Sequence, residues 1–285
     1  MDDVSRSKFA GGDQMYLRDE QYRDGSRLER RTNLHVRYGT ATIPWFEWVA
    51  SRIDLRAGQR VLEVGCGSGA LWDQRAVPIP EGVELSLCDL SPGMVAAATE
   101  RATARAEFAS VVGREADLQS LPFDDHCFDR VIANHMLYHL PDPSLGVAEL
   151  ARVVRPGGAV IVATNGFQHM RELHELESEV FGTNLVDPTI EAFGTEVGFG
   201  LLRQRFGDVR WVQYEDELRC SDPADVLAYV CSSPPGEDAT PDERARLEAA
   251  ITERFAVGGG VMTITKDVGC FVCSSPRRGA GAAGP

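Results

Sequence analysis

The residues of this chain best suited to chemistry form a glycine-rich turn. Residues 61–69 have the sequence VLEVGCGSG, an apolar run followed by glycines at alternate positions. Such a run is typical of a buried parallel strand, and glycine is needed where a backbone bends sharply or a ligand approaches it closely. Ligands of open α/β sheets bind at the carboxyl ends of the strands. The pattern therefore predicts a binding turn at the end of a first strand.

Acidic residues follow at the ends of the next expected strands. Asp89 ends the apolar segment 83–88, twenty residues after the turn. A carboxylate there can accept two hydrogen bonds from a ribose diol. Segment 115–123 is a third strand end with Asp117 and an apolar loop, and segment 128–134 is a fourth strand. Dinucleotide-binding domains share the glycine turn, so these later segments make the pattern more specific.

The elements that must position these residues alternate between strands and helices. A Pro-Gly-Gly turn at 156–158 leads into a fifth strand at 159–163, and segment 275–285 has the Gly/Ala/Pro/Arg composition of a disordered tail. The other predicted elements are helices over 13–53 and 167–181, strands at 209–218, 261–265 and 269–273, and helices at 221–230 and 241–255 with Ser221 and Thr240 as N-caps.

Composition restricts the class of protein. The net charge of −14 opposes a nucleic-acid partner, because phosphate binding depends on Lys and Arg. No apolar stretch is long enough to cross a bilayer, and the acidic start does not have the form of a signal peptide. Seven cysteines are scattered through strand and helix patterns, as expected of reduced thiols. These features predict a cytoplasmic protein without a membrane or nucleic-acid partner.

The ordered series of segments from 61 to 164 resembles class I S-adenosylmethionine-dependent methyltransferases, of the small-molecule branch similar to the ubiquinone/menaquinone biosynthesis methyltransferases. The resemblance implies an α/β fold with a doubly wound, seven-stranded, mostly parallel Rossmann-like sheet, whose seventh strand runs antiparallel beside the sixth. The implied divisions are an N-terminal helical lid (1–53), an S-adenosylmethionine-binding core (54–164), a substrate-covering insertion after strand five (165–208), C-terminal strands and helices that complete the sheet (209–274) and the tail (275–285).

The resemblance also implies an enzyme. It would transfer a methyl group from S-adenosylmethionine to O, N or C of a small organic acceptor, a specialised metabolite or quinone-like compound, and leave S-adenosylhomocysteine. Two alternatives stay open. A NAD(P)-dependent oxidoreductase fits the glycine turn and Asp89, but not the Asp117 loop or segment 134–140. A protein that keeps the cofactor but catalyses a non-methylating step, such as a cyclisation, differs only in its products. The oligomeric state is left open.

The same resemblance assigns cofactor contacts to the strand ends. The glycines of the turn would admit the methionine part, and Asp89 would hold the ribose hydroxyls. Asp117 would accept a hydrogen bond from the adenine amino group, with helix capping as its alternative role. Glu63 would hold the amino end or, equally, cap the loop as a buried acid. The expected cofactor-binding residues are Glu63, Gly65, Cys66, Gly67, Gly69, Asp89, Leu90, Met94, Asp117, Leu118 and Asn134.

Two histidines follow the fourth strand. His135 and His139 are spaced i,i+4, so on a helix they share a face. No metal is expected, because the acid of a zinc-protease helix is absent and no further ligand is placed to complete a site. By resemblance His139 is a catalytic base or a structural residue, and His135 is the better candidate to touch the substrate. Tyr16 and Tyr22 on the lid and His169 on the inserted helix are expected to bind the substrate.

Overall fold

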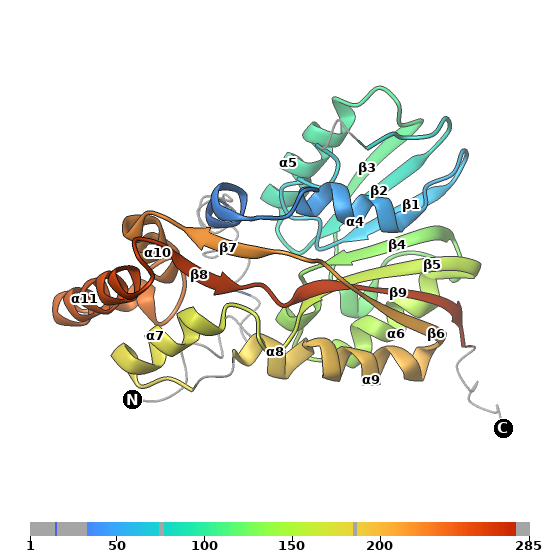
Figure 1. Ribbon diagram of the computed structural model, residues 1–285. Helices are drawn as coiled ribbons and strands as arrows, with labels where there is room; N and C mark the ends of the chain where they lie inside the picture. Colours follow the sequence, from blue (N-terminus) through green and yellow to red (C-terminus); the bar gives the residue numbers. More distant parts are fainter. Residues whose placement is uncertain (1–14, 16–32, 74–76, 185–186, 278–285) are drawn as a thin grey trace.

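A seven-stranded sheet runs through the molecule in the order β3-β2-β1-β4-β5-β9-β6 (Figure 1). The computed structural model describes residues 15, 33–73, 77–184 and 187–277. The first five strands pair in parallel, and β9 is antiparallel to both β5 and β6. The predicted fold class is thereby confirmed, including the antiparallel last strand. The strands are β1 (Arg60–Val64), β2 (Glu84–Asp89), β3 (Ser110–Glu115), β4 (Phe128–Asn134), β5 (Val154–Asn165), β6 (Phe206–Gln213) and β9 (Val268–Pro276).

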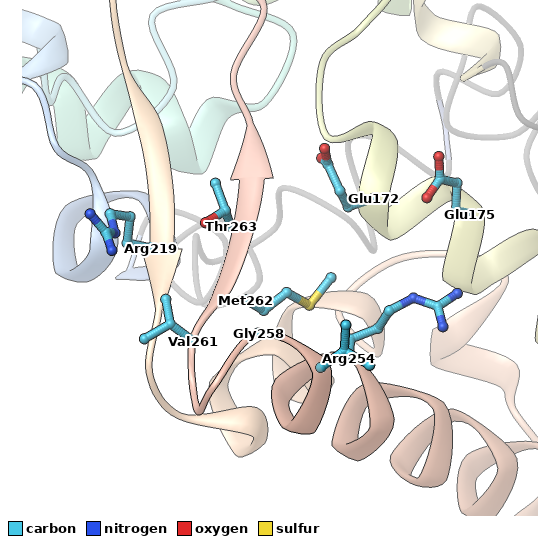
Figure 2. A pocket seen from close by; sticks show the side chains of 9 residues that line it. Glu172, Glu175, Arg219, Arg254, Gly258, Val261, Met262 and Thr263 are labelled. Carbon is cyan, nitrogen blue, oxygen red and sulfur yellow. The ribbon is translucent and has the colours of Figure 1, made fainter.

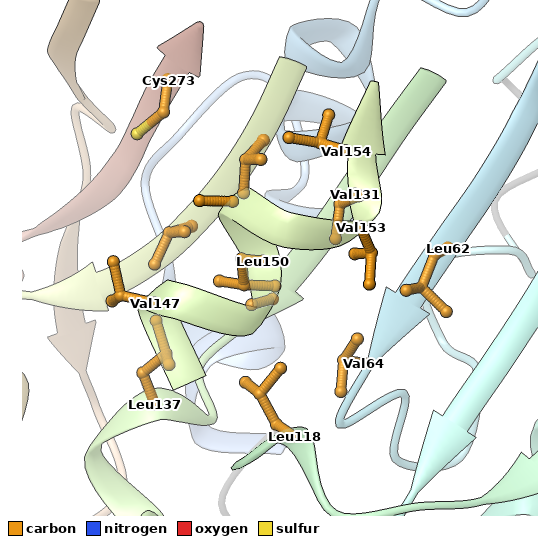
Figure 3. Packing of buried hydrophobic residues seen from close by; sticks show 14 of the residues in the cluster. Leu62, Val64, Leu118, Val131, Leu137, Val147, Leu150, Val153, Val154 and Cys273 are labelled. Atoms are coloured by element: carbon orange, nitrogen blue, oxygen red, sulfur yellow. The ribbon is translucent and has the colours of Figure 1, made fainter. Parts of the chain in front are cut away.

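Helices cover both faces of this sheet. On one face, α6 (Pro143–Val153) and α9 (Thr195–Arg205) pack over a core that includes Leu62 and Val64 of β1 (Figure 3). On the other face, α4 (Trp45–Ile53) and α5 (Pro92–Thr103) pack over Val61. A central strand covered on both faces must be apolar throughout, which explains the run that precedes the glycine turn. No helix of the described residues is both long and apolar enough to span a membrane.

The two cysteines of β9 illustrate the same alternation. Cys270 belongs to the core under α4, and Cys273 belongs to the core under α6. Both are buried free thiols, three positions apart on one strand. Side chains at this spacing point to opposite faces of a sheet, so the two residues pack separately and do not form a redox pair.

A two-stranded antiparallel ribbon extends from the sheet into a smaller lobe (Figure 1). The ribbon and its helices enclose a core of their own, which includes Leu34, Leu173, Leu247 and Ile264. The ribbon lobe consists of the helical segment 33–38, α7 (Arg171–Phe181), β7 (Glu217–Cys220), α10 (Pro223–Val230), η5 (Gly236–Asp238), α11 (Pro241–Val257) and β8 (Met262–Thr265). A short helix, α8 (Pro188–Phe193), connects α7 to α9.

The predicted single strand at 209–218 is wrong, because β6 ends at Gln213 and β7 begins at Glu217. Between them the chain leaves the sheet, and the Asp216 carboxylate accepts hydrogen bonds from the amides of Thr40 and Ala41. These polar contacts fix the departure of the ribbon. The pattern alone did not reveal the break, since apolar side chains such as Tyr214 and Leu218 flank the acidic residues on both sides.

The predicted helix boundaries differ from the structure in two places. The helix expected to begin at residue 167 begins at Arg171, because Met170 has a left-handed backbone (φ 57°). Asp222, and not Ser221, is the N-cap of α10, where its carboxylate accepts from the Ala224 amide. The expected N-cap Thr240 is confirmed and forms a capping box with Glu243 at the start of α11.

Candidate functional site

The glycine turn after β1 lies against the segment after β4 and against α5. Gly65 has φ of +64°, and a Cβ there would lie 2.7 Å from the Cβ of Met136. Gly69 has φ of +77°, and a Cβ there would lie 2.7 Å from the Cα of Ala98 on α5. A side chain at either position would be strained and would displace its neighbour. Glycine is therefore required for the turn to fit between its neighbours.

Asp89 ties this turn to the end of β2. One carboxylate oxygen accepts from the Gly67 amide at 2.9 Å, and the other accepts from the Ser91 amide at 2.9 Å. Burial raises the pKa of Asp89, and these backbone hydrogen bonds oppose the shift. Each carboxylate oxygen has a second lone pair, so the group can still accept from a pair of hydroxyls. The carboxylate is thus held in one orientation, as recognition of a diol requires.

Asn134 ends β4, two residues before Met136, which lies against the turn. Its Oδ1 is buried and has no hydrogen-bond partner among the described residues. A buried acceptor without a donor is uncommon and calls for a further partner. Together with the glycine turn and the fixed Asp89 carboxylate, this acceptor fits the nucleoside and amino-acid groups of the S-adenosylmethionine implied by the resemblance.

Asp117 occupies the end of the third strand region and caps a short helix, η3 (Leu118–Ser120). Its carboxylate accepts from the Gln119 amide at 2.9 Å and lies 3.2 Å from the Gln119 side-chain nitrogen. Leu118 and Met94 are buried nearly completely. The capping role is therefore present in the structure, while the contact of Asp117 with adenine stays a prediction.

Glu63 lies beneath the turn, where it is 2% exposed. Its Oε2 accepts from the indole nitrogen of Trp72 at 2.6 Å. Burial raises the pKa of Glu63 to about 8, against the lowering effect of the Trp72 hydrogen bond. Of the two roles expected for Glu63, the structure contains the contact of a buried structural acid, and its contact with the cofactor stays a prediction. The sequence had no signal for Trp72, because a contact across nine positions depends on how the turn folds.

The expected shared helix face of His135 and His139 is wrong. His135 has a left-handed backbone (φ 55°), and only η4 (Leu137–His139) follows it. The His135 ring lies 5.1 Å from the Trp45 ring, and burial and the charge of Lys266 lower its pKa to about 4. The His139 ring packs on Tyr138 at 4.5 Å. In the part of the chain that the structure describes, no three His, Cys, Asp or Glu residues are grouped so as to hold a metal.

The expected position of His169 on the inserted helix is wrong. In the structure it lies in the turn before α7. It is 8% exposed, its ring stacks on His35 at 6.3 Å, and its Nδ1 has no partner among the described residues. Burial and the neighbouring histidines and Lys266 hold its pKa well below the usual range. The predicted substrate residues Tyr16 and Tyr22 lie outside the described residues.

Lys266 was missed in the sequence. It lies between β8 and β9, with its Nζ 2.5 Å from an oxygen of Asp216 and 5.2 Å from the centre of the Tyr214 ring. Both side chains of the ion pair are buried, at 6% and 2% exposure. A signal was available: the chain has two lysines, Lys8 and Lys266, among 29 basic residues. The ammonium of lysine is more compact than the guanidinium of arginine and loses its proton more readily. A rare lysine between two strands of an arginine-rich chain therefore indicates a position where an ammonium is required.

One hollow of the described surface lies far from the strand ends, between α7, α11 and the ribbon (Figure 2). Glu172 accepts from the Thr265 amide at 2.8 Å, and Arg254 pairs with Glu179 at 2.9 Å. These charged groups have partners inside the ribbon lobe. The hollow is lined by Glu172, Glu175, Arg219, Arg254, Val257, Gly258, Val261, Met262 and Thr263, and by no residue of the glycine turn.

Residues 62–162 match a family profile described as a methyltransferase domain. The chain is 33% identical over 132 residues to a demethylmenaquinone methyltransferase of Corynebacterium glutamicum strain R, covering 46% of this chain and 52% of that protein. It is 35% identical over 134 residues to a malonyl-[acyl-carrier protein] O-methyltransferase of Hahella chejuensis, covering 47% and 46%. The chain thus spans about half the length of the curated relatives that it matches.

A solved structure shares the fold. It is described as a putative methyltransferase from an antibiotic biosynthesis pathway of Anabaena variabilis. The TM-score is 0.55 at 15% identity, and the likeness covers 80% of this chain and 96% of that one. The family match, over residues 62–162, includes the strand ends that carry the glycine turn, Asp89 and Asn134.

Proposed function

We propose that this chain, whose residues 62–162 match a methyltransferase domain, is a class I S-adenosylmethionine-dependent methyltransferase that transfers the methyl group of that cofactor to a small organic acceptor. The observation that carries the proposal is the Asp89 carboxylate, which is fixed by the Gly67 amide at the point where β1 and β2 end. The orphaned Asn134 acceptor lies at the neighbouring strand end.

The chain's own residues bind and orient the reactants. The Asp89 carboxylate holds the ribose hydroxyls, the glycine turn leaves room for the methionine part, and Asn134 accepts from its amino group. Bound S-adenosylmethionine supplies a methyl group on a sulfonium, which is already a good leaving group. The protein must then align the acceptor and exclude water. Trp45, Trp48 and Tyr214, with ring centres 5.1–5.4 Å apart, shield the space beside His135.

The domain does not define the acceptor. One relative is named for demethylmenaquinone and the other for malonyl-acyl-carrier protein, although each matches about half of the chain at similar identity. The aromatic cluster of Trp45, Trp48 and Tyr214 supports a partly apolar acceptor, such as a specialised metabolite or a quinone-like compound. The acceptor has to be sought in the residues outside the matched segment.

The proposal is tested by titration calorimetry with S-adenosylhomocysteine. Asp89→Ala should weaken binding by about tenfold to a hundredfold, because it removes a charge-assisted acceptor. Asp124→Ala, an exposed acid before β4, is the matched control and should leave the affinity unchanged. An Asp89→Ala variant with unaltered affinity would remove Asp89 from the cofactor site.

Two further measurements separate the alternative functions. Binding of NADH in place of S-adenosylhomocysteine would indicate an oxidoreductase. Incubation with S-adenosylmethionine carrying a labelled methyl group, followed by mass spectrometry of the product, tests turnover. A cofactor that binds but is never consumed while the acceptor is converted would indicate a non-methylating reaction.

A further inference from the structure

Five of the six histidines of the chain form one connected group with Lys266. The segment around Lys266 is bonded to the turn that carries His169, because the Met170 amide donates to the Thr265 carbonyl at 2.9 Å and the Gly166 amide donates to the Asp267 carbonyl at 2.7 Å. The charge of Lys266 contributes to lowering the pKa of both His135 and His169. The cluster is assembled from His35 of segment 33–38, His135 and His139 after β4, His169 in the turn before α7, His174 of α7, and Lys266 between β8 and β9. We call this set the histidine–lysine cluster.

Two members of the cluster have hydrogen-bonding capacity that the described residues do not satisfy. The buried Nδ1 of His169 has no partner there. Lys266 has three N–H donors, and Asp216 is the only hydrogen-bond acceptor that the described residues offer it. Asp216 is itself engaged by the Thr40 and Ala41 amides. Buried donors and acceptors without partners are costly, so this arrangement favours a ligand that supplies an oxygen.

The charges around the cluster favour an anionic oxygen. Lys266 is the cation of the cluster, and the groups that face His169 are His35, His135, His174 and Lys266. The nearby carboxylates already have partners. Asp216 pairs with Lys266, Glu177 and Asp187 lie against the His174 ring, and Asp267 accepts hydrogen bonds from the Gln168 amide and the Gln213 side chain. Burial keeps His135 and His169 neutral, so each imidazole has a lone pair that can accept a hydrogen bond from a hydroxyl. An ammonium ligand would meet a like charge here and offer no acceptor to Lys266.

The position of the cluster connects it to the methyl-transfer site. His135 directly follows Asn134, and its ring contacts Trp45. Lys266 lies over the ring of Tyr214, which also contacts Trp45. The cluster therefore adjoins the aromatic residues beside the strand ends, on the side provided by the ribbon lobe.

We propose that the histidine–lysine cluster is the acceptor site, and that the acceptor is an organic oxygen acid, a phenol, enol or carboxylic acid, whose oxygen lies between Lys266 and His169. The inference rests on the proposed methyltransferase function and names its substrate class. When a phenol or enol binds, its hydroxyl donates a hydrogen bond to the neutral imidazole of His169, and its oxygen faces the Lys266 ammonium. The imidazole takes the hydroxyl proton as the oxygen is methylated. A carboxylic acid arrives already ionised.

The test uses three naphthalene probes that share one ring and differ in charge: 2-naphthol, 2-naphthoate and 2-naphthylmethylammonium. Binding to the chain saturated with S-adenosylhomocysteine is followed by calorimetry and by tryptophan fluorescence, since Trp45 lies 5.1 Å from His135. At least one of the two oxygen acids should bind at least about tenfold more tightly than the ammonium.

Variants locate the site. His169→Phe should weaken binding of the oxygen acid by about tenfold or more. Because Lys266→Met alone would leave Asp216 charged and unpaired, the double variant Lys266→Met/Asp216→Asn is used, and it should have a similar effect. His126→Phe, at the opposite end of β4 where His126 contacts the Val154 carbonyl, is the control and should bind normally.

The outcomes separate this inference from the proposed function. Failure to bind S-adenosylhomocysteine would reject the function itself. Normal binding of S-adenosylhomocysteine would leave the function intact and reject the acceptor assignment in any of three cases: no binding of either acid, equal binding of the ammonium probe, or unchanged binding of the acids by both variants.

Discussion

Glu63 is a carboxylic acid held where water does not reach, with the Trp72 indole as its hydrogen-bond donor. Desolvation disfavours its charged form, and the negative charge of Asp89 adds to this effect. With a pKa of about 8, Glu63 is mostly protonated at neutral pH. The strand beneath the glycine turn therefore carries a neutral acid, whereas the Asp89 carboxylate binds the Gly67 amide of the turn itself.

This protonation predicts how stability depends on pH. The unfolded carboxyl titrates near 4.5, whereas the folded one keeps its proton up to about 8. Between these values the folded state binds a proton that the unfolded state lacks, so the free energy of unfolding should fall as pH rises, by at most about 1.4 kcal/mol per pH unit. Urea unfolding across this window measures the slope. Glu63→Gln should flatten it, and exposed Glu115→Gln should not. An identical slope in Glu63→Gln would contradict the assignment.

The residues of the site were predictable only where they lie next to each other along the chain or at strand ends. The glycines, Asp89 and Asn134 follow from the order of strands in an open α/β sheet. Trp72, Lys266 and Asp216 were not found, because each acts through a side-chain contact that forms only once the chain has folded. The i,i+4 spacing of His135 and His139 led to a wrong prediction of a shared helix face. His135 has a left-handed backbone, so no α-helix contains both residues.

At the scale of elements, the close approach of α5 to the glycine turn is the feature that most constrains the sequence. Gly69→Ala would place a Cβ 2.7 Å from the Cα of Ala98, a backbone atom that cannot rotate away. The helix must shift, so we expect a loss of stability of about 2 to 4 kcal/mol and weaker binding of S-adenosylhomocysteine. Denaturant unfolding and calorimetry measure the two effects.

A matched control separates the close approach from backbone strain. Gly157 has φ of +82°, similar to the +77° of Gly69, but a Cβ there would meet nothing within 4 Å. Gly157→Ala should therefore lower the free energy of unfolding by about 1 kcal/mol, the strain of a left-handed alanine, and leave cofactor binding unchanged. Equal losses in the two variants would show that α5 does not need to lie so close to the turn.

The elements of the sheet were predicted more successfully than those of the ribbon lobe. Buried parallel strands give long apolar runs, so β1, β2, β4 and β5 were evident. The ribbon consists of two four-residue strands, and its apolar side chains face a separate small core. The prediction of a strand at 261–265 matches β8, but β7 was merged with β6 into one predicted strand at 209–218.

At the scale of the whole molecule, two cores meet at one buried ion pair. The chain passes from the sheet to the ribbon through Asp216 and returns through Lys266. The Asp216 carboxylate also receives the amides of Thr40 and Ala41, just before α4. Although burial opposes it, these hydrogen bonds and the Lys266 charge hold the pKa of Asp216 below its ordinary value. One carboxylate therefore fixes three segments, and with them the position of the ribbon lobe beside the strand ends.

This arrangement predicts a local effect of Asp216→Ala. The substitution leaves the Lys266 charge buried without a partner and two amides without an acceptor, so it should destabilise the protein by about 3 to 5 kcal/mol. Because the sheet keeps its own core, hydrogen exchange should accelerate in β7, β8 and segment 39–41, while β1 and β4 stay protected. Asp208→Ala, which removes only an exposed contact with Ser274 on β9, is the control. Equal acceleration in β1 and β4 would mean that the two cores unfold as one unit, and unchanged exchange in β7 and β8 would mean that Asp216 does not fix the ribbon lobe.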